Sequence, residues 1–245
     1  MKRIVIVGAS SGIGRRIAID FARKGWGVAI AARREEKLKE VADLFPDQIE
    51  YEAIDVTAQD AVTRFNNLIE RNGGMDVLLF ASGVGFANPE LRQGLDDEIL
   101  AVNVKGFTKI INAAYKYYKN TENVGRGRIA AITSVAGTKG LGVAPTYSAS
   151  KRYLQTYLQA IDQLAHLQCV AVDVTDIRPG FIRTALLDPH KQYPLTMAVD
   201  YAAPLIEKAI ERGCRVATID WRWGLIEGLW RLIPNCIWPL LPIKV

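Results

Sequence analysis

Short apolar runs alternate with amphipathic stretches along most of the chain. The run at residues 4–7 is β-branched and uniformly apolar, which is typical of a parallel strand buried on both faces. The stretch at residues 12–23 carries apolar side chains at helical spacing, among them Ile17 and Phe21. The pattern therefore predicts a strand followed by a helix at the start of the chain.

The same alternation continues through the rest of the sequence. Further strands are predicted at residues 28–32, 49–56, 77–81, 128–133, 170–177 and 216–219. Further helices are predicted at residues 35–44, 59–71, 96–118, 147–167 and 198–212. Strands that alternate with helices predict an α/β fold, here a doubly wound parallel sheet (Rossmann fold) of about seven strands, with helices on both faces.

No linker rich in Pro, Gly or Ser divides the chain, so a single domain is expected. Residues 1–220 would form its dinucleotide-binding and catalytic part, and residues 221–245 an apolar C-terminal extension. This extension holds four of the five tryptophans, but charges and prolines interrupt it, so it is too short for a membrane span. We expect it to cap the sheet, line a pocket or pack on a second subunit. The alternative is an interfacial amphipathic helix that makes a peripheral membrane contact.

Composition narrows the class of protein. Hydrophobic residues make up 49% and charged residues 23%, which excludes a disordered or collagen-like chain. The net charge is +5 and the basic residues are scattered, so no nucleic-acid partner is expected, whereas an anionic small ligand or membrane surface fits. Three cysteines without metal-type spacing indicate no metal site and a reduced, cytoplasmic protein. The apolar run after Met1 is too short for a signal peptide, so we expect the start of the chain to belong to the fold.

A glycine cluster follows the first predicted strand and opens the first predicted helix. Its residues are Gly8, Ala9, Ser10, Ser11, Gly12, Ile13 and Gly14. Glycines let a backbone turn sharply beside a pyrophosphate, and a helix N-terminus offers free N–H groups to it. An ordinary strand-to-helix turn is the alternative, but the position of the cluster favours a dinucleotide site.

Arg33 and Arg34 follow the second predicted strand, where proteins that bind NAD carry an acidic residue for the ribose 2′-hydroxyl. A guanidinium group binds a 2′-phosphate instead, so the cofactor is predicted to be NADP (NADPH), with Arg33 favoured over Arg34. Asp55 and Val56 follow the third predicted strand. The Asp55 carboxylate would either bond the adenine amino group or cap the next helix.

Tyr147 and Lys151 stand four residues apart in a predicted helix and therefore share one face. An ammonium group beside a phenol favours the phenolate, so Lys151 is expected to lower the pKa of Tyr147 and make it a general acid–base. The alternative for this spacing is a surface pair on a helix. Ser134 follows the fifth strand, where its hydroxyl could bond a substrate oxygen or serve a turn. Asn103 is a poor helix former inside a predicted helix, where it would bridge water or a carbonyl, or be exposed.

Taken together and in this order, these residues resemble the classical short-chain dehydrogenase/reductase family over residues 1–220. The resemblance implies a catalytic tetrad of Asn103, Ser134, Tyr147 and Lys151. It also implies a Pro-Gly segment after the sixth strand, at residues 178–184. The residues implied to bind the cofactor are Gly8, Ser10, Ser11, Gly12, Ile13, Gly14, Arg33, Arg34, Asp55, Val56, Ala81, Ser82, Gly83, Tyr147, Lys151, Pro179, Gly180, Ile182 and Thr184.

Two departures from the family pattern stand out. Val7 replaces the usual Thr before the first glycine, and the usual Asn-Asn-Ala-Gly after the fourth strand reads Phe80-Ala81-Ser82-Gly83. The missing asparagine affects fine positioning of the central strands, while all four catalytic positions are present.

The resemblance implies an NADP(H)-dependent oxidoreductase that interconverts a carbonyl and a secondary alcohol. Apolar side chains in residues 185–199 suggest an apolar, lipid-like small-molecule substrate. A homodimer or homotetramer is expected through the helices at 96–118 and 147–167. One alternative is a non-catalytic NADP-binding sensor of the same fold. The other is a membrane-surface protein that uses residues 221–245.

Overall fold

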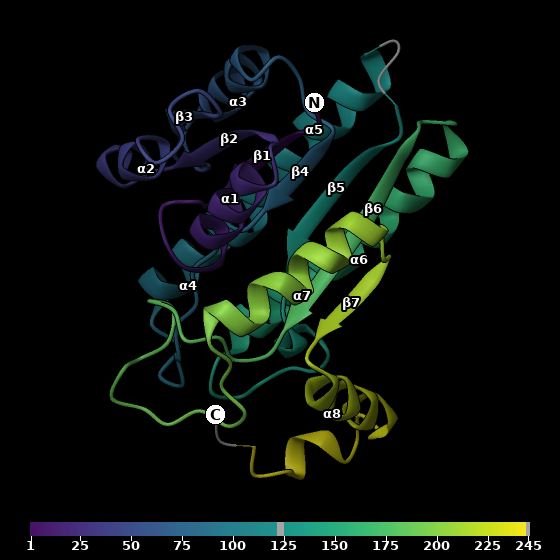
Figure 1. Ribbon diagram of the computed structural model, residues 1–245. Coiled ribbons are helices and arrows are strands. Elements are labelled where there is room, and N and C mark those ends of the chain that lie inside the picture. Colours follow the sequence, from purple (N-terminus) through teal and green to yellow (C-terminus); the bar gives the residue numbers. More distant parts are fainter. Residues whose placement is uncertain (122–124, 244–245) are drawn as a thin grey trace.

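The strands pair in the order expected of a doubly wound sheet. The computed structural model describes residues 1–121 and 125–243, and its seven strands are all parallel, in the order β3-β2-β1-β4-β5-β6-β7 (Figure 1). The strands are β1 (Arg3–Val7), β2 (Gly27–Ala32), β3 (Ile49–Ala53), β4 (Val77–Phe80), β5 (Gly127–Ile132), β6 (Val172–Pro179) and β7 (Val216–Ile219). The chain reverses direction across the sheet between β3 and β4, so ligands are expected at the carboxyl ends of β1 and β4.

Each face of the sheet has its own core. Along β1, Ile4 and Ile6 face one apolar cluster, whereas Val5 and Val7 face the other, because successive side chains of a strand point to opposite faces. The first cluster is covered by α1 (Gly12–Arg23), α2 (Glu35–Ala42) and α7 (Val199–Arg212). The second is covered by α3 (Ala61–Arg71), α5 (Phe107–Asn120) and α6 (Pro145–Leu167). The predicted fold class is thus confirmed.

One predicted helix is wrong in detail. The pattern at residues 96–118 predicted one continuous helix, but the structure has α4 (Gln93–Ile99), a π-helical turn η1 (Leu100–Gly106) and then α5. A π-helical turn widens the backbone spiral and is often found at functional sites. Here the widened turn contains Asn103, whose side chain bonds a loop outside the helix.

The third strand is also shorter than predicted. It ends at Ala53 rather than at residue 56, because the chain turns at residues 55–58, where Ala58 N donates to Asp55 O over 3.0 Å. Asp55 and Val56 therefore lie in a loop, and α3 begins only at Ala61. The sixth strand likewise starts at Val172, since Val170 still bonds the end of α6.

The C-terminal extension folds back onto the carboxyl edge of the sheet. It contains α8 (Trp221–Leu232) and a short 3-10 turn, η3 (Trp238–Leu240); a second 3-10 turn, η2 (Val135–Gly137), follows β5. The Trp238 indole donates to Gly140 O over 2.6 Å, and the Lys139 ammonium donates to Ile233 O over 2.9 Å. These bonds fasten residues 233–238 to the loop that leads into α6, at the end of the molecule where β7 terminates (Figure 1).

Candidate active site

A cavity of about 1360 Å³ lies at the carboxyl ends of the strands. It gathers loops that are far apart in the sequence, namely those that follow β1, β2, β3, β4, β5 and β6. Of the predicted site residues, the following line it: Gly8, Ser10, Ser11, Gly12, Ile13, Gly14, Arg33, Arg34, Asp55, Val56, Ala81, Ser82, Gly83, Ser134, Tyr147, Lys151, Pro179, Gly180, Ile182 and Thr184. Asn103 is the exception and lies behind the cavity wall.

The glycine loop between β1 and α1 is shaped by close backbone contacts. Gly8 has a φ of +99°, and a Cβ there would lie 2.4 Å from the Ser82 nitrogen. A Cβ at Gly14 would lie 2.3 Å from the Gly8 oxygen. Larger residues at either position would push the loop away from β4 or from α1. The loop thus leaves the N-terminus of α1 facing the cavity, which is the geometry that suits a pyrophosphate.

The two arginines after β2 take different places. The Arg34 guanidinium donates to the hydroxyls of Ser10 and Ser11 over 2.9 and 3.0 Å, so it lies on the glycine loop. Arg33 is exposed and acts electrostatically on Asp55. Arg34 thus touches the glycine loop, whereas Arg33, which the sequence favoured as the 2′-phosphate ligand, makes no such contact. Both cations remain available to an anion at this end of the cavity.

Asp55 is held by the turn that follows β3. One carboxylate oxygen accepts from the Thr57 backbone N–H and hydroxyl over 2.8 and 2.7 Å. Burial favours the neutral acid, but the two bonds from Thr57 and the charge of Arg33 outweigh it and hold the pKa of Asp55 below its usual value. Asp55 is therefore an anionic acceptor that caps a turn rather than a helix. Val56 beside it packs on Gly106 in the π-helical turn, where a Cβ would lie 2.5 Å from the valine methyl.

Ser134, Tyr147 and Lys151 meet at the carboxyl end of β5. Tyr147 and Lys151 lie one turn apart in α6, and the Lys151 ammonium is 5.6 Å from the centre of the Tyr147 ring. That ammonium is buried and donates to Ile132 O over 3.2 Å. The Ser134 hydroxyl accepts from the Ala136 N–H over 3.1 Å, so it also caps the 3-10 turn. The hydroxyl, phenol and ammonium groups all border one side of the cavity.

In the protein alone, the pKa of Tyr147 shifts in the direction opposite to the one expected from Lys151. Burial raises the pKa of Tyr147 to about 12, and the Ser134 hydroxyl acts in the opposite direction. Burial lowers the pKa of Lys151 to about 8, against the attraction of Asp176. Loss of water is thus the dominant cause of both pKa shifts. At neutral pH the phenol is protonated, and Lys151 titrates within reach of neutrality.

Asn103 is buried rather than exposed. Its amide oxygen accepts from the Val84 N–H over 2.9 Å, and its amide nitrogen donates to Val84 O over 2.8 Å and to the Ser150 hydroxyl. The amide thereby ties the π-helical turn to the loop after β4 and to α6. A Cβ placed on Gly83 would lie 3.4 Å from the Asn103 amide oxygen and 3.6 Å from the Lys151 ammonium. Asn103 and Lys151 therefore both lie close to Gly83.

The segment after β6 closes the cavity from the opposite side. Ile182 forms a parallel bridge with Met197, so the loop between them leaves and returns at one point. Thr184 lies against the glycine loop, 3.2 Å from where a Cβ on Gly12 would be. Gly180 lies under the Trp223 indole of α8, where a Cβ would approach the ring to 2.1 Å. The inner face of α8 is thus part of the site.

Three contributors were not found from the sequence. Gly85 packs on the Tyr147 ring, where a Cβ would come within 2.6 Å of the ring. The Gln155 amide donates to Ser134 O over 2.8 Å and steadies the backbone of that serine. Gln155 continues the four-residue spacing of Tyr147 and Lys151, and this spacing was the available signal. Trp223 gave no signal, because its contact with Gly180 joins segments 43 residues apart.

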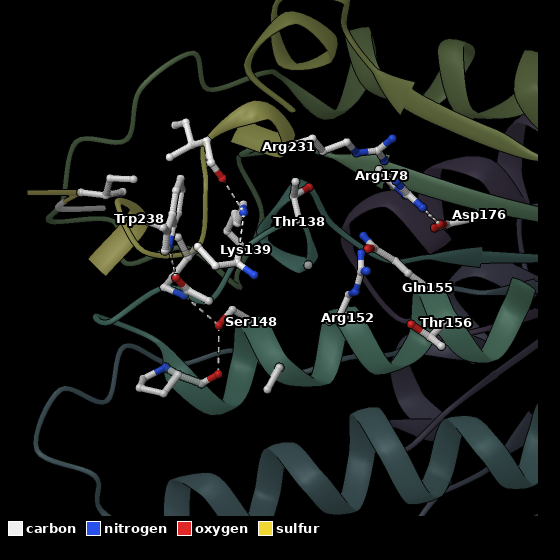
Figure 2. Close-up of a pocket in the computed structure, with 18 of the residues that line it drawn as sticks. Thr138, Lys139, Ser148, Arg152, Gln155, Thr156, Asp176, Arg178, Arg231 and Trp238 are labelled. Carbon is white, nitrogen blue, oxygen red and sulfur yellow. Dashed lines mark hydrogen bonds and ion pairs between the residues drawn. The ribbon is translucent and has the colours of Figure 1, made fainter. Parts of the chain in front are cut away.

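A second cavity, of about 1660 Å³, lies between α6, β6 and the C-terminal extension (Figure 2). Gln155 lines it, and the Gln155 amide oxygen has no hydrogen-bond partner among residues 1–121 and 125–243. Figure 2 also shows the Arg178 guanidinium bonded to Asp176, at 2.6 Å. The opposite end of this guanidinium pairs with the buried Glu227 of α8, also at 2.6 Å. A buried ion-pair chain therefore runs from beneath Lys151 to α8.

Comparison with known proteins identifies the family to which the chain belongs. A family model described as short chain dehydrogenase matches residues 2–193. The chain belongs to the classical short-chain dehydrogenase/reductase family. An oxidoreductase of Myxococcus xanthus, itself described as uncharacterized, is 30% identical over 238 residues, which is 94% of this chain and 92% of that one. A Staphylococcus saprophyticus relative, described in the same way, is 31% identical over 76% of this chain and 80% of its own.

Solved structures of other short-chain dehydrogenases/reductases share the fold. A 3-ketoacyl-(acyl-carrier-protein) reductase from Brucella melitensis, complexed with NADH, superposes with a TM-score of 0.78 at 22% identity, over 89% of this chain and 95% of its own. An alcohol dehydrogenase from Thermococcus sibiricus, complexed with 5-hydroxy-NADP, superposes with a TM-score of 0.76 at 26% identity over the same shares. The seven-stranded sheet is thus that of the family, whose solved members include complexes with both kinds of nicotinamide cofactor.

Proposed function

We propose that this short-chain dehydrogenase/reductase uses NADP(H) to interconvert a carbonyl and a secondary alcohol on an apolar substrate. One observation carries the proposal: a single cavity joins the glycine loop and Arg34 at one end to Ser134, Tyr147 and Lys151 at the other. A cytoplasmic location, which rests on the cysteine usage, and a homodimer or homotetramer, which rests on the family resemblance, belong to the same proposal.

The residues present fit a nicotinamide dinucleotide. The close backbone contacts at Gly8 and Gly14 hold the glycine loop at the N-terminus of α1, where free N–H groups suit a pyrophosphate. Arg34, with Arg33 beside it, would hold a 2′-phosphate, and the ionised Asp55 would accept from the adenine amino group. Ile182 and Thr184 line the opposite wall, where the family resemblance puts the nicotinamide. When bound, this cofactor supplies or accepts the hydride.

The chain's own residues handle the proton. In the reductive direction Tyr147 donates its phenolic proton to the substrate oxygen, and a phenol with a pKa of about 12 is fully protonated for that step at neutral pH. Ser134 donates a hydrogen bond to the same oxygen. Lys151, whose pKa is about 8, holds a positive charge beside the phenol and favours the phenolate left behind. Asn103 and Gly85 position the loop and the tyrosine ring.

The substrate end of the cavity is lined mainly by apolar side chains, and Arg92, Glu98, Asp188 and Lys191 also border the cavity. Its lining there comes from the loops before α4 and α6, from the loop after β6 and from α8, and it comprises Phe86, Leu141, Val143, Leu186, Leu187, Tyr193, Trp223, Ile226 and Trp230. Such a lining supports a hydrocarbon-rich ketone or alcohol and disfavours a charged one, because buried charges are costly without partners.

The test compares the wild-type protein with Tyr147→Phe and Arg34→Ala. Binding of NADPH and NADH is followed by nicotinamide fluorescence, and turnover is measured with a panel of apolar ketones. We expect NADPH to bind more tightly, and Arg34→Ala to weaken NADPH by about tenfold or more while it leaves NADH nearly unchanged. Tyr147→Phe should bind NADPH normally and lose turnover by about a hundredfold or more.

Each arm can contradict the proposal. Preference for NADH would overturn the assignment of Arg34 to a 2′-phosphate. Turnover that survives in Tyr147→Phe would remove that phenol from the reaction. Tight NADPH binding with no turnover on the ketones or on the matching alcohols would favour a cofactor-binding sensor.

A further inference from the structure

Helix α8 presents its apolar face to solvent. Trp221, Leu225, Leu229 and Leu232 are 71, 60, 63 and 79% exposed, whereas the acidic Glu227 is buried. Their spacing of four, four and three residues puts the four apolar side chains on one side of the helix, which we call the outer face of α8. Exposed apolar surface of this extent marks an interaction site in soluble proteins.

The rotation of α8 is fixed from inside. Glu227 pairs with Arg178, which in turn bonds Asp176, and the Thr218 hydroxyl also donates to Glu227. The Trp223 ring fills the space above Gly180. Turning the helix to bury its leucines would strand these buried charges without partners, at a large cost in free energy. The outer face therefore stays at the surface.

The apolar surface continues beyond the helix. Ile237, Leu240 and Leu241 of the C-terminal extension are 46, 80 and 36% exposed. The bonds of Lys139 and Trp238 hold this segment against the body of the protein (Figure 2). The ribbon shows α8 and the segment that follows it together at one end of the molecule (Figure 1). The exposed apolar side chains of both segments therefore lie at the same end of the molecule.

The charges beside the outer face are positive. Within residues 221–243 the acidic Glu227 is buried, and Asp220 just before the helix is buried as well. Their partners Arg231 and Arg222 keep 55 and 41% of their side chains exposed. The carboxylates thus lie beneath the surface, and the guanidinium groups lie on it. An apolar stripe edged by arginines matches the hydrocarbon boundary and phosphates of an anionic lipid surface.

We propose that the outer face of α8 docks on an anionic bilayer as an interfacial helix. The contact is peripheral, because no helix in the described part of the chain has the length and apolarity to cross a bilayer. The inner face of α8, through Trp223, Ile226 and Trp230, lines the active-site cavity. Docking therefore brings that cavity to the lipid surface. Resting on the proposed function, this assigns as substrate an amphiphile that partitions into the bilayer.

The test is flotation of the purified full chain with vesicles of phosphatidylcholine, alone or mixed with phosphatidylglycerol. The variant is the double substitution Leu225→Gln and Leu229→Gln. The matched control is the double substitution Leu44→Gln and Leu167→Gln. These leucines have a similar exposure, 54 and 75%. They precede β3 and β6 and so lie at the amino edge of the sheet, opposite α8. We expect the wild type and the control to float with the anionic vesicles, and the α8 variant to lose at least about tenfold in partitioning.

Trp221 supplies a second readout. Its fluorescence should shift to the blue when anionic vesicles are added, and Trp221→Phe should lose most of that shift while it still floats. Particle mass in solution is measured for the same proteins. If the wild-type protein floats with neither kind of vesicle, the proposal is wrong. If the wild type does not float and the α8 variant has a lower particle mass than the wild type, the outer face is an interface between copies of the chain.

These readouts do not depend on turnover or on the cofactor. The α8 variant should also reduce a water-soluble ketone at the wild-type rate, since neither leucine lines the active-site cavity. Failure of the docking proposal is therefore distinguishable from failure of the proposed function.

Discussion

Helices α1 and α8 are each twelve residues long and both follow a strand at the carboxyl edge of the sheet, yet α8 buries a carboxylate beside Trp223, whereas no charged residue of α1 is buried. In α1, Ile17 and Phe21 are fully buried and the arginines lie outside. In α8, Glu227 is buried and Leu225 is exposed. The apolar stripe of a helix therefore does not always mark its inner face.

The difference comes from what each helix meets on the sheet. Helix α1 packs on the apolar side chains of β1 and β2, so burial of hydrocarbon orients it. Helix α8 meets the buried Arg178 at the end of β6, whose guanidinium bonds Asp176 at one end and Glu227 of α8 at the other. This buried ion pair, together with the Trp223 ring above Gly180, fixes which way the last helix faces.

The largest expected effect is the loss of a core side chain from α1. Phe21→Ala should lower the free energy of unfolding by about 3–5 kcal/mol, because it empties a fully buried site. Leu225→Ala in α8 should change it by less than about 0.5 kcal/mol, because that leucine is already in water. Urea unfolding measures both. Equal losses would mean that α8 is buried in the protein as it exists in solution.

Loss of a carboxylate from an ion pair should lower the free energy of unfolding more in α8 than in α1. Glu227→Gln leaves Arg178 and Arg231 facing a neutral amide and should cost about 3 kcal/mol of unfolding free energy. Asp20→Asn in α1, whose partner Arg16 is partly exposed, should cost less than about 1 kcal/mol.

The triple variant Glu227→Leu, Arg178→Met and Asp176→Asn serves as the control for that pair, because Arg178 also bonds the buried Asp176. It removes all three buried charges, so it should recover much of the loss seen in Glu227→Gln. If the two single substitutions cost the same, charge pairing does not orient α8.

A third helix buries a lysine, and the expected effect of that burial on stability is smaller. Helix α6 buries Lys151, whose ammonium bonds a carbonyl oxygen, and burial lowers its pKa from 10.5 to about 8. Between these two values the unfolded chain holds the proton and the folded chain releases it. The fold therefore loses stability as pH falls from 10.5 to 8, and the full penalty remains at pH 7.

Lys151→Met removes this penalty. It should raise the free energy of unfolding by about 2 kcal/mol at pH 7, and the gain over wild type should vanish by about pH 10. Unfolding of both proteins across that pH range measures the difference, and Lys191→Met, at an exposed loop position, controls for loss of a lysine charge. A difference that stays constant with pH would show that burial of Lys151 does not carry the effect.

Much of the fold was predictable because it depends on local periodicity. Alternation of apolar runs and helical stripes identified the seven strands and the order of the helices around them. The π-helical turn at Leu100–Gly106 was not predictable, since the Asn103 side chain within it bonds Val84, which lies outside the helix. The end of β3 depended in the same way on a turn held by Asp55.

The candidate site was predictable where a residue type carries its own chemistry. The glycine loop, Ser134, Tyr147 and Lys151 line one cavity, as their spacing suggested. Shifts in pKa that depend on burial could not be predicted from the sequence. The pKa of Tyr147 is therefore raised, whereas the sequence predicted that it would be lowered. The orientation of α8 depended on Arg178 and Glu227, which are 49 residues apart in the chain.

The contact between Gly180 and Trp223 limits which substitutions these two positions can accept. The indole occupies the space where any side chain at position 180 would begin, and its N–H also donates to Leu195 O over 3.3 Å. A larger residue at 180 is tolerable only where the ring has been replaced by something smaller. Among relatives that keep α8 the two positions should therefore co-vary, and a tryptophan in the last helix should accompany a glycine after the sixth strand.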